Sequence, residues 1–162
     1  MSDFQNRLDH SHAAYRAAVT WCLVAKERGF PFDLRGLRFE SESQLQSVIV
    51  ELGWAFEPRF FAILEQYYKA NGFEKFVDFK DKYLNNKFDP ESVRGFVELS
   101  KLRQIILHGD GDEQYVWDGN KLGVPEGCEP HILPEHVEKL YRLLTSLFSA
   151  GGNESSLEDQ AC

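Results

Sequence analysis

Three side chains that can take part in chemistry lie close together in the 162-residue chain: Arg103, Gln104 and His108. A histidine can transfer protons near neutral pH. An arginine can bind two anionic oxygens at once and keeps its positive charge at all relevant pH values. An amide can hydrogen-bond to either kind of group. Whether these side chains can act together depends on the element that carries them.

The segment that carries them is predicted to form a helix. Asp89 is a plausible N-cap and Pro90 suits the first helical position. Gly109 is the residue type that often follows the last helical turn, so His108 is expected in that turn. The helix dipole there favours the protonated form of an imidazole.

Arg103 has an unusual place on this predicted helix. At 100° per residue it lies in the middle of the apolar face, whereas Gln104 and His108 lie one turn apart on an adjoining face. A buried arginine must be paired, reach water, or face a cleft, because a lone buried guanidinium is very costly. A purely structural interpretation stays open, in which Arg103 pairs with a glutamate of another helix and His108 only completes the helix end.

Helical periodicity also dominates the rest of the chain. Pro58 is expected to kink or break one of the predicted helices. The expected helical segments are residues 4–28, a helix that starts after Ser41 or Ser43 and reaches Pro58, an aromatic stretch over 60–71, a short helix over 73–86, and a last helix over 134–150.

Three other segments are predicted to be non-helical. Residues 29–40 are expected to form a loop, and residues 114–124, with Asp118-Gly119 between two apolar runs, a small β-hairpin. Residues 151–162 are expected to be a disordered tail. The predicted fold is therefore an all-α, compact bundle of four to six helices with a β-hairpin insertion near 114–124. Residues 1–150 form its single domain.

Most motifs for cofactors are missing from the sequence. There is no glycine-rich nucleotide loop and no Gly-x-Ser-x-Gly elbow. His10 and His12 are two residues apart, so their rings are expected on different faces of a helix rather than on one zinc ion. No cofactor and no metal are expected.

A metal site after the helix is the least favoured interpretation. His108, Asp110 and Asp112 are close in sequence, which leaves a metal hydrolase as a third hypothesis. A calcium loop that starts at Asp110 fails, because Tyr115 stands where the loop needs glycine and Lys121 where it needs glutamate.

The run Leu102-Arg103-Gln104-Ile105-Ile106-Leu107-His108-Gly109 resembles the signature of HEPN domains (higher eukaryote and prokaryote nucleotide-binding). That signature is an Arg, usually followed by a polar residue, and then a His after four to six positions. The preceding Phe96-Val97-Glu98-Leu99 and the order of helices are also similar. The residue after the arginine is commonly Asn, Asp or His in that family, and here it is Gln104.

The resemblance implies a metal-independent endoribonuclease with Arg103 and His108 as catalytic residues and Gln104 in support. Such proteins are common in toxin–antitoxin and phage-defence systems, and an antitoxin or regulatory protein is then an expected partner. The resemblance also implies a homodimer in which two copies of the motif face one cleft. On an ideal helix Arg103 and His108 are about 140° apart, so two helices at a dyad suit one phosphate better than one helix does. The alternative is a non-catalytic HEPN-like interaction or regulatory module.

The net charge of −8 limits how RNA could bind. The acidity is concentrated in the C-terminal half, so a broad phosphate-binding surface is excluded, but a small local site is not. The locally basic stretch around Phe30 and Phe32 is expected to be an ordinary loop rather than a platform for single-stranded nucleic acid. Its cations are Lys26, Arg28, Arg35 and Arg38.

The remaining composition points to a cytoplasmic protein. No apolar run approaches the length of a membrane span, and the N-terminus does not resemble a secretory signal. The cysteines are too few and too scattered for a disulfide framework, which favours a reducing compartment. No membrane partner is expected.

Overall fold

The computed structural model describes the chain except for residues 1–2, 35, 109–133 and 162. The described residues confirm the predicted class, an all-α bundle with one small β-hairpin. The long helices are α1 (Asp3–Arg28), α2 (Glu42–Ala70), α5 (Pro90–His108) and α6 (Pro134–Ala161). None of the described helices is both long enough and apolar enough to cross a membrane.

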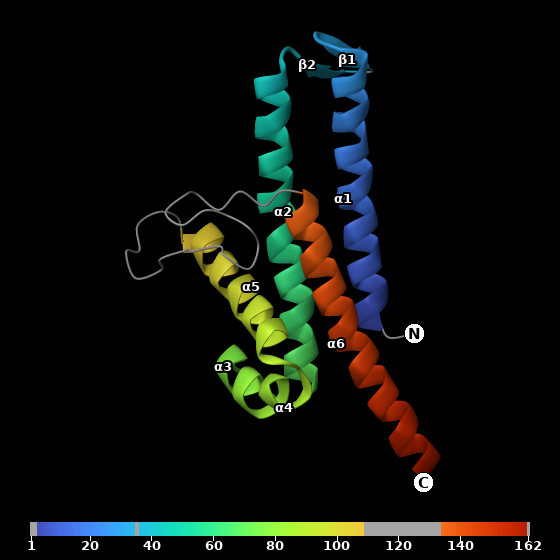
Figure 1. The fold of residues 1–162 in the computed structure, drawn as a ribbon, viewed down its shortest axis with the longest axis vertical. Coiled ribbons are helices and arrows are strands. Elements are labelled where there is room, and N and C mark those ends of the chain that lie inside the picture. Colours follow the sequence, from blue (N-terminus) through green and yellow to red (C-terminus); the bar gives the residue numbers. More distant parts are fainter. Residues whose placement is uncertain (1–2, 35, 109–133, 162) are drawn as a thin grey trace.

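Helix α2 is the centre of the bundle (Figure 1), and it contacts α1, α5 and α6. α1 and α2 run side by side in opposite directions, α6 packs against both of them, and α5 lies along the other side of α2. The main core fills the space between these helices. Its fully buried side chains include Leu8, Phe60, Leu64, Phe96, Leu99, Leu102, Val137 and Leu144.

Of the two effects predicted for Pro58, the break was wrong, because α2 is one helix from Glu42 to Ala70 with Pro58 inside it, and the kink stays a prediction. A proline in a helix interior removes one hydrogen bond and costs about 3 kcal/mol. Phe56, Phe60 and Phe61 on either side of it are buried in the main core. Because packing supplies most of the stability of a helix in a protein, burial of these rings holds the helix together through the proline.

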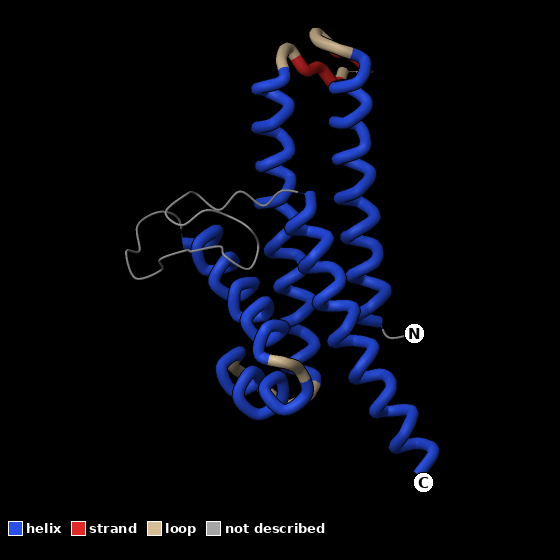
Figure 2. Tube along the Cα trace, viewed as in Figure 1, coloured by secondary structure: helices blue, strands red, loops and turns tan. Residues whose placement is uncertain are grey.

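The hairpin lies at a position where a loop was expected (Figure 2). β1 (Phe32–Leu34) pairs antiparallel with β2 (Leu37–Phe39), with Phe32 opposite Phe39. Gly36 between the strands has a φ of +87°, which glycine adopts without strain. The predicted loop over 29–40 was therefore wrong in part, and the hairpin predicted over 114–124 lies outside the described residues.

The hairpin covers the ends of α1 and α2 that project beyond α5 and α6 (Figure 1). There a second, smaller set of buried residues packs together, which we call the tip cluster: Cys22, Ala25, Phe32, Phe39, Leu45 and Ile49. The partly buried Leu52 packs against both the tip cluster and the main core.

A short helical segment connects α2 to α5, as predicted. It consists of α3 (Phe76–Phe79), a π-helical turn η1 (Lys80–Leu84) and α4 (Asn85–Lys87). Phe79 is fully buried and stacks on Tyr83 with 5.0 Å between ring centroids. The aromatic rings of this segment pack against Tyr67 and Tyr68 at the end of α2.

Helix α6 is longer than the prediction. Its backbone continues to Ala161, into the segment 151–162 for which a disordered tail was expected. Extending an existing helix avoids the cost of nucleation, and Glu154, Leu157 and Glu158 favour helix. This extension passes beyond the rest of the bundle (Figure 1).

Candidate functional site

Arg103 lies at the boundary between α5 and α2. Its guanidinium carbon is 4.6 Å from the centroid of the Phe61 ring, and its Nη2 is 3.5 Å from Oε2 of Glu65. The side chain remains 31% exposed. The structural interpretation of Arg103 is therefore confirmed in its first part, since the guanidinium pairs with a glutamate of another helix and lies on an aromatic face.

Helix α2 supplies the partners of Arg103 from a single row. Glu57, Phe61, Glu65 and Lys69 follow one another at intervals of four residues, so they lie along one side of the helix. The Nζ of Lys69 is 3.1 Å from Oε1 of Glu65. Each carboxylate oxygen of Glu65 thus has its own cation. We call Phe61, Glu65, Lys69 and Arg103 the Arg103 site.

Glu57 is a buried carboxyl group in the same row. It has no exposed surface, and neither of its oxygens has a hydrogen-bond partner among the described residues. Burial raises the pKa of Glu57 to about 8, although the positive charge of Arg103 lowers it in part. Around neutral pH this carboxyl group therefore binds a proton that an exposed glutamate would release.

Tyr68 borders the Arg103 site from α2. Its side chain is buried, and burial is the main reason that its pKa is raised. The charge of Glu65 raises the pKa further, and that of Arg103 lowers it. The Tyr68 ring thus lies close enough to the Arg103 site for both charges to act on its hydroxyl.

The structure places the backbone of Gln104 and His108 on α5, as predicted from the sequence. His108 lies five residues after Arg103, which is about 7.5 Å further along the helix axis. The side chains of Gln104 and His108 lie outside the described part, as do Asp110 and Asp112. The contact between the Arg103 and His108 side chains therefore stays a prediction.

Four residues near Arg103 were not among the predicted site residues: Glu57, Phe61, Glu65 and Lys69. Their spacing of four residues was visible, but Pro58 led to two separate predicted elements and hid the continuous row. Sequence alone also does not say which face of α2 contacts α5. The signal present in the sequence is the spacing of four residues that places Phe61, Glu65 and Lys69 on one side of a helix.

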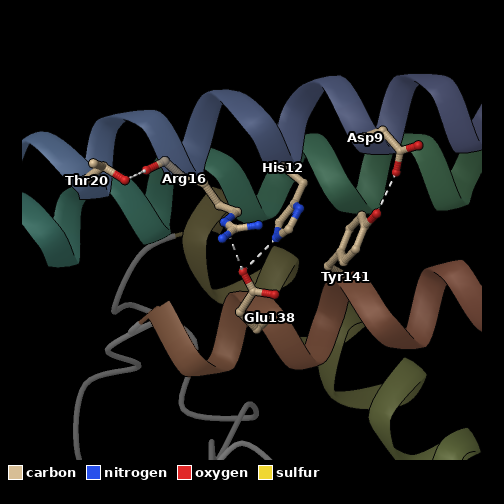
Figure 3. Close-up of polar contacts among 6 residues, drawn as sticks. All are labelled: Asp9, His12, Arg16, Thr20, Glu138 and Tyr141. Carbon is tan, nitrogen blue, oxygen red and sulfur yellow. Dashed lines mark hydrogen bonds and ion pairs between the residues drawn. The ribbon is translucent and has the colours of Figure 1, made fainter.

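A second polar cluster connects α1 to α6 (Figure 3). The Nε2 of His12 lies 2.7 Å from Oε1 of Glu138, and the Nε of Arg16 lies 4.0 Å from the same oxygen. The hydroxyl of Tyr141 donates a hydrogen bond of 2.7 Å to Asp9. The two contacts join the helices one turn apart.

His12 is held between these contacts. Its ring stacks on Tyr141 with 3.7 Å between centroids and 8° between planes, and the residue is buried. His10 is exposed, so the two histidines lie on different faces of α1, as predicted. His12 fills the gap between Leu8 and Tyr15 in the apolar stripe of α1, which is the signal that could have identified it as a buried residue.

Two cations and one aromatic ring of the basic stretch before α2 have partners within the protein. Arg38 pairs with Asp33 and Glu40, and Lys26 pairs with Glu42. Phe32 is buried in the tip cluster, so its face is not free to stack on a base.

Within the residues that the structure describes, no group of three or more His, Cys, Asp or Glu side chains could hold a metal ion. Cys22 is a free, buried thiol whose pKa is raised by burial. Comparison of the chain with family models, with curated proteins and with solved structures gives no match.

Proposed function

We propose that this chain is a metal-independent endoribonuclease of the HEPN type. In this proposal Arg103 binds the scissile phosphate, His108 transfers protons between the ribose 2′-OH and the leaving 5′-oxygen, and Gln104 supports the phosphate. RNA is the substrate, and two copies of the chain form one site. A role as a toxin or a phage-defence component fits such an activity.

The observation that carries the proposal is the state of Arg103. Its side chain is 31% exposed, and the Phe61 ring holds the guanidinium in place, so it can meet a phosphate without first being ordered. A guanidinium gives two parallel hydrogen bonds to non-bridging phosphate oxygens and stabilises the charge that develops there. Helix α5 continues to His108, as the motif requires.

In the proposed reaction one proton is removed from the ribose 2′-OH and one proton is supplied to the leaving 5′-oxygen. A neutral imidazole takes the proton of the 2′-OH, the oxygen attacks phosphorus, and the bond to the 5′-oxygen breaks as that oxygen receives a proton. The products are a 2′,3′-cyclic phosphate and a 5′-hydroxyl. In a dimer, the two copies of His108 can divide the roles of base and acid.

The test is incubation of purified protein with total RNA in excess EDTA. We expect cleavage in EDTA, and at least a hundredfold slower cleavage by Arg103→Ala and by His108→Ala. Arg94 is an exposed arginine on the same helix and His10 is an exposed histidine, so Arg94→Ala and His10→Ala are matched controls that should retain the activity. Loss of cleavage on chelation contradicts the proposal and favours a metal hydrolase. Toxicity on expression that His108→Ala relieves would support the same role in cells.

A second candidate is a non-catalytic helical interaction or regulatory module. It is favoured by two large apolar side chains of α1, Trp21 and Leu23, which are 48% and 51% exposed. RNA that stays intact in an excess of folded protein selects this candidate over the nuclease.

A further inference from the structure

The carboxylate of Glu65 lies between two cations from two helices. Its Oε2 is 3.5 Å from the Nη2 of Arg103 on α5, and its Oε1 is 3.1 Å from the Nζ of Lys69 on α2. Arginine and lysine bind carboxylate and phosphate oxygens by the same charge-assisted hydrogen bonds. Glu65 therefore occupies the position in which these two cations would hold a phosphate.

Both cations are open to an anion from solvent. The side chain of Lys69 is 54% exposed and that of Arg103 is 31% exposed, whereas Glu65 is 26% exposed. An ion pair at such exposure contributes little to stability, so a phosphate can displace the carboxylate at small cost. Phe61 keeps the guanidinium in place when Glu65 leaves, because the ring contact does not depend on the carboxylate.

A surface hollow adjoins the same lysine. Its volume is about 620 Å³, and it is lined by Lys69, Gly72, Phe73 and Glu74 at the end of α2. That volume is in the range of small-molecule sites, and Phe73 offers an aromatic side chain beside the charged one. A nucleotide next to the bound phosphate has room there.

We propose that Arg103 and Lys69 together bind a backbone phosphate of RNA, that Glu65 blocks this site in the free protein, and that the hollow beside Lys69 receives the adjoining nucleotide. The proposal rests on the proposed function, and it adds Lys69 as a binding residue and Glu65 as an internal competitor. Binding of RNA then exchanges one anion for another on the same two cations. In a chain with a net charge of −8 this exchange keeps the affinity for RNA modest.

The test measures binding without cleavage. The probe is a fluorescein-labelled single-stranded RNA of twelve nucleotides with 2′-O-methyl groups throughout, which has no 2′-OH to attack, and the readout is fluorescence anisotropy. We expect Glu65→Gln to bind the probe about threefold more tightly than the unchanged protein.

Glu51→Gln is the matched control, because Glu51 is an exposed glutamate on the same helix and the substitution changes the net charge equally. An equal gain from Glu65→Gln and Glu51→Gln overturns the proposal, since net charge alone then explains the effect. The double variant Glu65→Gln with Lys69→Gln should not show the tighter binding of the probe that Glu65→Gln shows. Tighter binding that persists without Lys69 also overturns the proposal.

Competition with inorganic phosphate distinguishes a site for RNA backbone phosphate from a site for free phosphate. We expect millimolar phosphate to compete with the probe only weakly, because an RNA also fills the hollow beside Lys69. Phosphate that binds while the RNA probe does not bind at low salt overturns the assignment to RNA. Tighter binding of the probe by Glu65→Gln together with no cleavage of natural RNA contradicts the nuclease proposal but supports the binding site. Failure of the nuclease proposal can therefore be distinguished from failure of the binding proposal.

Discussion

The guanidinium of Arg103 lies 4.6 Å from the centroid of the Phe61 ring, across the contact between α5 and α2. This relationship explains how an arginine can lie on the apolar face of a helix. The ring accepts the flat cation on one side, while the exposed part of the side chain keeps contact with water and with Glu65.

The contact between Arg103 and Phe61 can be measured by a double-mutant cycle. We expect Phe61→Leu to lower the free energy of unfolding by about 1–2 kcal/mol, from lost burial and lost cation–π attraction. The coupling energy with Arg103→Gln should be about 0.5–1 kcal/mol in urea denaturation. Additive effects of the two substitutions would show that the ring and the guanidinium do not interact.

Glu57 should make the stability of the fold depend on pH. Its pKa is about 8 in the folded protein and near the ordinary value of 4.5 in the unfolded chain. Between these values the folded state holds a proton that the unfolded state has released, so the free energy of unfolding falls as pH rises, with a limiting slope of about 1.4 kcal/mol per pH unit. This contribution to stability is complete below pH 4.5 and is lost by about pH 8.

Glu57→Gln removes this titration. We expect the variant to be more stable than the unchanged protein at pH 8 and to show little difference at pH 5, as measured by denaturant unfolding at both values. Glu51→Gln, in an exposed position of the same helix, should leave the pH dependence as it is. An unchanged slope in Glu57→Gln would mean that this carboxyl group is ionised in the folded protein.

Tyr141 should contribute to the attachment of α6 to α1. Tyr141→Phe removes the hydrogen bond of 2.7 Å to Asp9 but keeps the ring that stacks on His12. We expect a loss of about 0.5–1.5 kcal/mol, or a fall in Tm of about 1–6 °C. Asp9→Ala removes the same hydrogen bond together with the bond of 2.8 Å from Gln5, so the double variant should lose less than the sum of the two single losses. Two fully additive losses would contradict this assignment.

The nuclease proposal requires two copies of the chain. Sedimentation at micromolar concentration should give a mass of twice 18.7 kDa. Mixing Arg103→Ala with His108→Ala should restore part of the activity if one copy supplies the arginine and the other the histidine. A monomeric mass at this concentration argues strongly against a shared site.

Local signals in the sequence predicted some elements well. Asp89 and Pro90 marked the start of α5, and the side chain of Asp89 hydrogen-bonds to Ser92, which lowers the pKa of the Asp89 carboxyl group. The apolar stripes of α1 and α6 were visible because their period is helical throughout. These features depend on residues within one or two turns of each other.

Other features depend on contacts between distant segments. Pro58 is tolerated because aromatic rings on both sides of it are buried against other helices, which no local rule takes into account. The hairpin strands Phe32–Leu34 and Leu37–Phe39 are three residues long, shorter than the runs that usually indicate a strand. Likewise, Arg103 was expected to need a partner, but only the packing of α5 on α2 identifies Glu65 as that partner.

The tip cluster has a consequence for how the protein opens. Its buried residues are separate from the main core, and few side chains, such as Leu52, connect the two. We expect the β1–β2 end of the molecule to behave as its own cooperative unit, whose amides exchange with deuterium at a lower opening free energy than those of α2 beside Phe60 and Leu64. The ends of α1 and α2 next to the hairpin can then unfold locally and refold while the bundle that holds Arg103 stays folded.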